Sequence, residues 1–172
     1  MDWAAVRSPN FSVPSPRRLA LVVATIVIID QWSKMWAVNA LVNARTIHVV
    51  WTLRFALGFN SGIAFSQAQG LGPFVGLIAI GAIVMMARAA VRASTALSAY
   101  GLAIIVAGAV GNVADRIFRG DGWLHGRVVD FIDFQWFPVF NAADSAITIG
   151  AGLLIIGLSR EYVDSKRNGR TS

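Results

Sequence analysis

Apolar residues gather in four segments of the chain, and shorter stretches that hold most of the charged residues separate them. Each segment comes close to the roughly 20 mainly apolar residues that a helix needs to cross the hydrocarbon core of a bilayer. The first carries Asp30, Gln31 and Lys34 after an unbroken apolar run, and the fourth carries Asp144 near its start. The pattern predicts four transmembrane helices, over about 19–41, 71–87, 93–114 and 137–159.

Two longer loops, 42–70 and 115–136, lie on one side of the predicted bundle. The stretch RTIHVVWTLRFALGF (45–59) is rich in β-branched and aromatic residues with partial alternation, which is typical of one or two short strands. The stretch VVDFIDF (128–134) has the same strand-like character. We therefore expect a mainly α membrane protein, with four transmembrane helices and a small extracytoplasmic β-sheet and loop region on the membrane surface.

The composition agrees with a membrane protein and leaves room for one domain. Of the 172 residues, 56% are hydrophobic and 14% are charged, whereas soluble domains have roughly 25% charged residues. We expect a single four-helix membrane domain over 19–160. A flexible cytoplasmic tail over 1–18, which contains several Pro and Ser residues, precedes it, and a basic cytoplasmic tail over 161–172 follows it.

A cleaved signal peptide is the alternative interpretation of the first apolar segment. Arg17 and Arg18 precede the apolar run, and the residues 42–44 resemble a small-residue cleavage site. However, Asp30 and Lys34 lie between the run and that site. An uncleaved helix is therefore favoured.

The formal net charge of +6 would fit a nucleic-acid-binding protein, but the basic residues flank the apolar segments and form no continuous stripe. No nucleic-acid partner is expected, and the bias of Lys and Arg towards cytoplasmic loops explains the charge better. The side of the two termini carries nine basic residues, namely Arg7, Arg17, Arg18, Arg88, Arg92, Arg160, Lys166, Arg167 and Arg170. The other side carries five, namely Arg45, Arg54, Arg116, Arg119 and Arg127. Both termini should therefore be cytoplasmic.

Several chemistries are excluded or disfavoured by the residues present. The chain has no Cys, which excludes thiol nucleophiles and thiolate metal sites. The two histidines, His48 and His125, are isolated, so no metal and no other cofactor are expected. A serine–lysine dyad of Ser33 and Lys34 is disfavoured, because adjacent residues of a helix point about 100° apart.

Asp30 and Lys34 are one helical turn apart, with the acid on the N-terminal side, which is the favourable order for an ion pair. We expect a structural pair near the outer half of the first helix, in which the Lys34 ammonium reaches along the helix to the membrane interface.

Three aspartates, Asp130, Asp133 and Asp144, lie near one predicted membrane surface in apolar company. Asp144 stands at a helix start, where unpaired amides and the helix dipole favour an anion, and Asn141 could cap that helix. Two carboxyl groups at close range do not both ionise easily, so one can hold a proton while the other activates water. The residues alone leave open whether Asp130 or Asp133 is the partner. Two alternatives also stay open: a small transporter or proton-conducting protein in which Asp30, Asp130 and Asp144 form a relay, and a purely structural scaffold.

Five blocks of the sequence resemble the bacterial lipoprotein signal peptidases, the type II signal peptidases. They occur in the order of that family and between the spans where the family has them, and they cover the chain from about 19 to 160. The blocks are DQWSK (30–34), FNSGIAFS (59–66), GNVADR (111–116), GRVVDFIDF (126–134) and FNAADSAITIG (140–150). One departure is the loop 117–126, which is longer than in the shortest family members.

The resemblance implies an aspartyl endopeptidase of the bacterial cytoplasmic membrane, with its active site near the outer face. Such an enzyme removes the signal peptide of diacylglyceryl-modified prolipoproteins just before the lipidated cysteine and is inhibited by globomycin. Its expected partners are that substrate and membrane lipids, and it is expected to be a monomer.

The resemblance also implies a role for single residues. The catalytic pair is Asp130 and Asp144, with Asp133 a non-catalytic neighbour. The substrate-binding positions are Asn60, Asn112, Arg116 and Asn141. The supporting positions are Asp30, Lys34 and Asp115.

Overall fold

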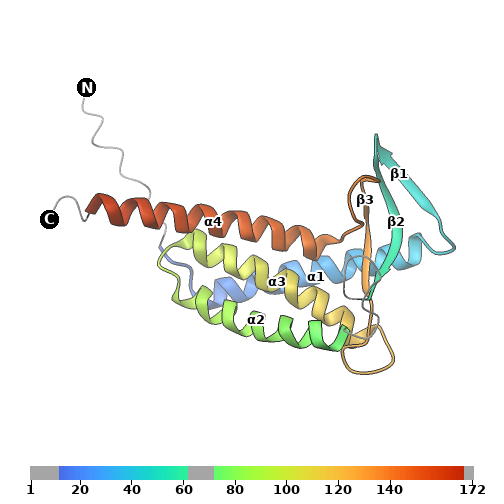
Figure 1. Cartoon of the computed structure of the whole chain (residues 1–172), viewed down its shortest axis with the longest axis horizontal. Helices are drawn as coiled ribbons and strands as arrows, with labels where there is room; N and C mark the ends of the chain where they lie inside the picture. The colour runs from blue at the N-terminus through green and yellow to red at the C-terminus, as the bar shows by residue number, and fades with distance from the viewer. Residues whose placement is uncertain (1–11, 62–71, 169–172) are drawn as a thin grey trace.

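The structure is a computed structural model, and it describes residues 12–61 and 72–168. The helices are α1 (Pro16–Ala40), α2 (Gly72–Arg92), α3 (Ala96–Phe118) and α4 (Ala142–Asn168). The strands are β1 (Thr46–Val50), β2 (Leu53–Asn60) and β3 (Val128–Asp133). The helices form an elongated bundle, and the sheet stands at one end of it (Figure 1). The start of α1 and the end of α4 lie at the opposite end.

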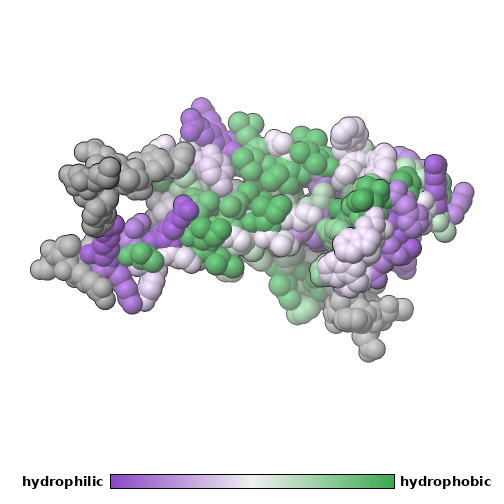
Figure 2. Space-filling view, turned by 90° about the horizontal axis from the view of Figure 1, so that it is seen from above, coloured by the Kyte–Doolittle hydropathy of each residue, from purple (hydrophilic) through white to green (hydrophobic). Residues whose placement is uncertain are grey.

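All four helices are long and apolar enough to cross a membrane. The visible face of the molecule has a hydrophobic middle, with hydrophilic residues towards both ends (Figure 2). Such a band is what a lipid-facing surface requires, because apolar side chains gain nothing from burial inside the protein when the surrounding solvent is hydrocarbon. The predicted fold class, a mainly helical membrane protein with a small sheet, is confirmed.

The ends of the helices differ from the predicted spans. The fourth helix begins at Ala142 and not at 137, because Phe140 pairs with Ile132 beside β3 and so lies outside the helix. It then runs to Asn168, into the stretch predicted as a tail. The first helix begins at Pro16, also inside a predicted tail. Residues 1–11 and 169–172 of the two predicted tails lie outside the described residues.

The second helix extends to Arg92, beyond the predicted end at 87. The third begins at Ala96 because Thr95 caps it, with the Thr95 hydroxyl accepting a hydrogen bond from the Ser98 N–H at 3.2 Å. It continues to Phe118 and thereby includes both members of the Asp115–Arg116 pair that the pattern placed after the span.

The three strands form an antiparallel sheet in the order β1, β2, β3. The expectation of strands in 45–59 and in 128–134 is confirmed. The sheet packs against the end of α1 through a core that contains Ala37, Leu41 and Phe131. Around it, Trp36 and Phe55 pack edge-on with their ring centroids 5.4 Å apart. Together these contacts hold the sheet, and with it β3 and Asp130, against the end of the bundle.

Glycines on the shared face hold α4 close to α3. A Cβ atom on Gly101 would stand 2.7 Å from the backbone nitrogen of Leu154, and one on Gly150 would stand 2.7 Å from the carbonyl oxygen of Gly101. Side chains cannot occupy such positions, so the two backbones approach as closely as small residues allow. This approach brings Asn112 on α3 beside Asp144 on α4.

Candidate active site

The convergence of Asp130 and Asn141 follows from the return of the chain after β3. Phe140 and Ile132 exchange two backbone hydrogen bonds. The Ile132 nitrogen lies 2.8 Å from the Phe140 oxygen, and the Phe140 nitrogen lies 3.0 Å from the Ile132 oxygen. The next residue, Asn141, therefore comes to lie beside β3. Its side-chain nitrogen Nδ2 donates a hydrogen bond to Oδ1 of Asp130 over 2.6 Å, and both residues are buried.

Asn141 and Asp144 hold each other at the start of α4. The Asp144 N–H donates to Oδ1 of Asn141 at 3.0 Å, and the Asn141 N–H donates to Oδ2 of Asp144 at 3.1 Å. Such a reciprocal pair satisfies backbone donors that the first turn of a helix leaves unpaired. The expected capping role of Asn141 is confirmed. Asn141 therefore hydrogen-bonds to both Asp130 and Asp144, so the two acids are neighbours on either side of this one residue.

A second asparagine, Asn112 on α3, fixes the other oxygen of Asp144. Its Nδ2 donates to Oδ1 of Asp144 at 2.8 Å, and its Oδ1 accepts from Nζ of Lys34 at 3.0 Å and from Nδ2 of Asn141 at 3.2 Å. An ammonium group is a donor only, so the amide oxygen of Asn112 must face Lys34. The amide nitrogen must then face Asp144. Lys34 thereby sets the orientation of Asn112.

Lys34 is completely buried, with no exposed side-chain surface. Its Nζ lies 2.9 Å from Oδ2 of Asp30 and 2.9 Å from Oδ2 of Asp115, and Asn112 accepts its third proton. The predicted ion pair with Asp30 is confirmed. The expectation that Lys34 reaches to the interface is wrong, because three acceptors inside the protein use every donor of its ammonium group.

The two acids beside Lys34 join separate elements of the fold. Oδ1 of Asp30 accepts from the backbone N–H of Ala143 at 2.9 Å and so ties α1 to the first turn of α4. Oδ2 of Asp115 accepts from the N–H of Val129 at 3.1 Å and so ties α3 to β3. Both acids therefore hold the elements that carry Asp144 and Asp130.

Two residues of this network were not among the predicted site residues. Nε2 of Gln31 lies 3.1 Å from Oδ2 of Asp30 and 3.1 Å from Oδ1 of Asp115, and Nε of Arg119 forms an ion pair with Asp115 at 2.8 Å. A glutamine inside an apolar span was a visible signal for the first. Arg119 could be found only by its spacing of one turn from Asp115. His125 is exposed, and its Nδ1 lies 2.9 Å from the carbonyl oxygen of Trp123.

The environment of Asp130 favours a protonated carboxyl group. Asp130 is 5% exposed, and this burial raises its pKa from the usual 3.8 to about 6. The nearby charge of Asp144 also raises the pKa, whereas the hydrogen bonds from Asn141 and Asn60 and the charge of Lys34 lower it. Asp144 is only half-buried. The pair thus combines a buried acid that holds its proton up to about pH 6 with a more accessible one.

Asp133 has a different environment from Asp130. Its Oδ2 pairs with Nε of Arg54 at 2.7 Å, and its Oδ1 accepts from the Gln135 N–H at 2.6 Å. Burial alone would raise the pKa of Asp133, but these hydrogen bonds outweigh it, and the pKa lies below its usual value. Asp133 is therefore an ionised structural residue of the sheet, bonded away from the pair.

Two further predicted residues lie around the acid pair. The Asn60 side chain, at the end of β2, hydrogen-bonds to Asp130. Arg116 on α3 is 8% exposed and interacts electrostatically with Asp130 and Asp144. Within 12–61 and 72–168, Nη1 of Arg116 is buried without a hydrogen-bond partner. Part of the block FNSGIAFS, 62–66, lies outside the described residues.

A cavity of about 510 Å³ opens beside Asp144. Its walls come from the loop before α4 and from the first two turns of α4, and apart from Asp144 and two hydroxyl side chains they are apolar. The lining residues are Phe137, Pro138, Val139, Phe140, Asp144, Ser145, Thr148 and Ile149. An apolar segment can therefore lie next to the accessible acid.

Two solved structures share this fold, and both are described as bacterial membrane enzymes studied by the in meso method. One, at 2.3 Å resolution, is 28% identical, matches with a TM-score of 0.74 and covers 86% of this chain and 90% of its own. The other, at 1.9 Å, is 29% identical, with a TM-score of 0.71, and covers 82% and 92%. The four apolar helices and the likeness to these structures define a multi-pass membrane enzyme.

The chain belongs to the Signal peptidase (SPase) II family, whose model matches 22–160. Relatives described as lipoprotein signal peptidases cover most of the chain. The relative from Mycobacterium avium (strain 104) is 41% identical over 145 residues, which are 82% of this chain and 80% of the relative. The relative from Mycobacterium leprae (strain Br4923) is 38% identical over 145 residues, which are 82% and 72%. The resemblance found in the five sequence blocks is confirmed, and the protein is a membrane peptidase.

Proposed function

We propose that this protein is an aspartyl endopeptidase that cleaves diacylglyceryl-modified prolipoproteins just before the lipidated cysteine, with Asp130 and Asp144 as its catalytic pair. The observation that carries the proposal is Asn141, which hydrogen-bonds to both acids and so keeps them adjacent. The relatives described as lipoprotein signal peptidases support the substrate class.

The different burial of the two acids supports a division of labour. Asp130, with its pKa of about 6, holds a proton and donates it to the oxygen of the scissile carbonyl group. Asp144 is half-buried beside the open cavity and, when ionised, takes a proton from a water molecule. The water oxygen attacks the carbonyl carbon. When the tetrahedral intermediate collapses, Asp144 gives its proton to the leaving amine and Asp130 recovers its own, so no covalent enzyme intermediate forms.

Four polar residues complete the proposed site. Asn112 and Asn141 orient the carboxyl groups through the hydrogen bonds described above. Arg116 has a buried Nη1 available as a donor to a substrate carbonyl group, and Asn60 stands at the exposed end of β2. The apolar cavity beside Asp144 suits the apolar part of the substrate.

We place the site near the outer face of the bacterial cytoplasmic membrane, with both termini in the cytoplasm. The distribution of basic residues supports this orientation, since the end of the bundle with Arg17, Arg88 and Arg92 lies opposite the sheet. Cleavage at that face meets the substrate where its lipidated cysteine emerges from the membrane.

The test uses a lipidated prolipoprotein and the purified full-length enzyme. Asp130→Asn and Asp144→Asn should each abolish cleavage while the thermal unfolding transition in detergent remains cooperative. Asp133→Asn is the matched control, because it removes a carboxylate three residues from Asp130 and should leave cleavage in place. Full cleavage by either of the first two variants would overturn the assignment of the pair. Globomycin should block the wild-type reaction.

A further inference from the structure

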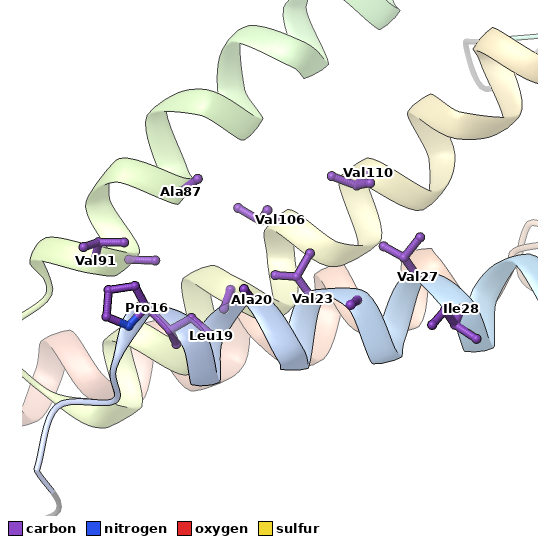
Figure 3. A pocket seen from close by; sticks show the side chains of 13 residues that line it. Pro16, Leu19, Ala20, Val23, Val27, Ile28, Ala87, Val91, Val106 and Val110 are labelled. Carbon is purple, nitrogen blue, oxygen red and sulfur yellow. The ribbon is translucent and has the colours of Figure 1, made fainter.

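A second cavity lies away from the acid pair, between α1 and α2 near the ends that carry Pro16 and Val91 (Figure 3). We call it the α1–α2 groove, and its volume is about 580 Å³. The walls come from α1 and α2, and Ala103, Val106 and Val110 of α3 form the floor. Every lining residue is apolar. The groove therefore offers nothing to a polar ligand but matches a hydrocarbon chain.

The groove is open because α1 and α2 diverge. At one end, Leu19 and Ala90 belong to the same packed cluster as Ala103. From there α2 runs away from α1, and Val106 and Val110 lie between the two helices (Figure 3). On α3, Ala103 is nine residues from Asn112, which places them about 180° apart around the helix. The groove thus lies on the face of α3 opposite the residue that bonds to Asp144.

The mouth of the groove, by which we mean its end near Pro16 and Val91, is positively charged. Arg17 is exposed and precedes Ala20 by three residues and Ala24 by seven, so it shares the face of α1 that lines the groove. Arg88 and Arg92 of α2 are exposed at the same end. The combination of a hydrocarbon slot with cations at its mouth is complementary to a lipid whose headgroup carries negative charge.

We propose that the α1–α2 groove binds an acyl chain of an anionic membrane phospholipid, whose phosphate group pairs with Arg17. An apolar segment of the substrate fits this groove less well, because the end of a signal peptide that precedes its apolar stretch is positively charged. That charge would meet the arginines at the mouth with repulsion. The lipid fills the gap between α1 and α2 and holds their diverging ends together.

The test measures lipid binding by native mass spectrometry of the full-length protein in detergent. The probes are phosphatidylglycerol and phosphatidylcholine with identical acyl chains, so only the headgroup charge differs. The wild type should retain phosphatidylglycerol preferentially. Arg17→Gln should lower that retention roughly fivefold, since one basic residue near an anionic headgroup contributes about that factor. The matched control is Arg18→Gln, which removes the same charge at a neighbouring residue that points about 160° away from Ala20.

A second pair of variants tests the slot itself. Ala24→Phe fills the groove and should abolish retention of both lipids, whereas Ala89→Phe, an equal change at an exposed residue of α2 outside the groove, should not. Ala20→Phe provides a second groove-filling variant, and thermal unfolding checks that each protein is folded. Equal losses in Arg17→Gln and Arg18→Gln, or unchanged retention in both groove-filling variants, would overturn the proposal. So would a groove-filling variant that raises KM for the lipidated substrate and leaves lipid retention unchanged.

Discussion

The acidity of Asp130 should depend on the side chain of Asn141, and the variant Asn141→Ser tests this dependence. Serine keeps an oxygen that can cap α4 by accepting from the Asp144 N–H, but it lacks the amide group that donates to Oδ1 of Asp130 at 2.6 Å. The variant Asn141→Ala lacks both functions. A comparison of the two separates the effect on acidity from the effect on the helix start.

The size of the effect follows from the geometry. A short hydrogen bond to a buried charged group contributes about 1.5–3 kcal/mol, and a difference of about 1.4 kcal/mol between protonation states corresponds to one pKa unit. The bond stabilises ionised Asp130, so its loss raises the pKa from about 6 by roughly 1–2. Asn141→Ala should in addition lose about 1 kcal/mol of unfolding free energy with the cap.

The assay is the pH dependence of kcat/KM for a lipidated prolipoprotein, which reports the ionisation of the free enzyme. If Asp130 must hold a proton, the wild-type activity falls as the pH rises through about 6. In both variants this alkaline limb should move to higher pH by a similar amount. The limbs of the pH profile report the ionisation of the coupled Asp130–Asp144 pair. The test therefore compares how far the alkaline limb moves between the wild type and each variant. An alkaline limb that stays in place, or moves to lower pH, in Asn141→Ser would refute the reasoning.

Four further predictions concern stability and are measured by unfolding in detergent. Asp130→Asn should stabilise the protein by about 3 kcal/mol above pH 7, because ionising a buried Asp130 is costly, and the gain should shrink as the pH falls from about 6 towards 3.8. Asp133→Asn should destabilise it by about 1–2 kcal/mol at neutral pH, a difference that disappears in acid as the wild-type carboxylate is itself protonated. Changes of the same sign in the unfolding free energies of Asp130→Asn and Asp133→Asn would contradict both assignments. Lys34→Met should destabilise by about 3–5 kcal/mol, since it leaves the buried Asp30 carboxylate without its cation and the Asp115 carboxylate with Arg119 alone. A loss below about 1 kcal/mol would show that the cluster is not closed as described. Gly111→Ala should destabilise by about 1–3 kcal/mol because its methyl group would stand 2.5 Å from Oδ2 of Asp30. The control is Gly152→Ala, which has nothing within 4 Å of the added methyl group and should be neutral or stabilising.

The four spans were predictable because their signal is local. Hydrophobicity alone identifies a helix that faces lipid, and the β-branched stretches identify the strands. The helix ends were less predictable because tertiary contacts set them. The apolar residues 137–140 fit a helical pattern, but Phe140 pairs with Ile132 beside β3. As a result α4 begins only after Asn141, which caps it.

The choice between Asp130 and Asp133 could not be made from the residue types. They are three residues apart in one strand, so they point to opposite faces of the sheet. Only the register shows which face meets Asn141: Asp130 lies opposite Gly58, whereas Asp133 lies opposite Arg54 and pairs with it. Family resemblance pointed to Asp130, and the strand register supplies a physical reason for that choice.

The burial of Lys34 was missed for a related reason. Asp30 lies four residues before Lys34 on α1, so this partner can be recognised from the sequence. The other two partners, Asn112 and Asp115, lie on α3, and Asn112 is 78 residues away along the chain. A local pattern therefore shows one partner of the ammonium group and leaves two of its protons unassigned. Reaching towards water was the reasonable expectation for a lysine with one partner, and only the packing of α1 against α3 removes the need for it.

The hydrogen-bond network separates the residues that position the acid pair from the residues that set its acidity. Lys34 is paired with two carboxylates and Arg119 adds a second cation, so the buried cluster is close to neutral and places little net field on the pair. Its effect passes instead through the forced orientation of Asn112. The acidity of Asp130 depends mainly on burial, on the charge of Asp144 and on the bond from Asn141. Changes that keep the net charge of the cluster should therefore alter stability and kcat with little movement of the pH profile, whereas changes to Asn141 should move the profile itself.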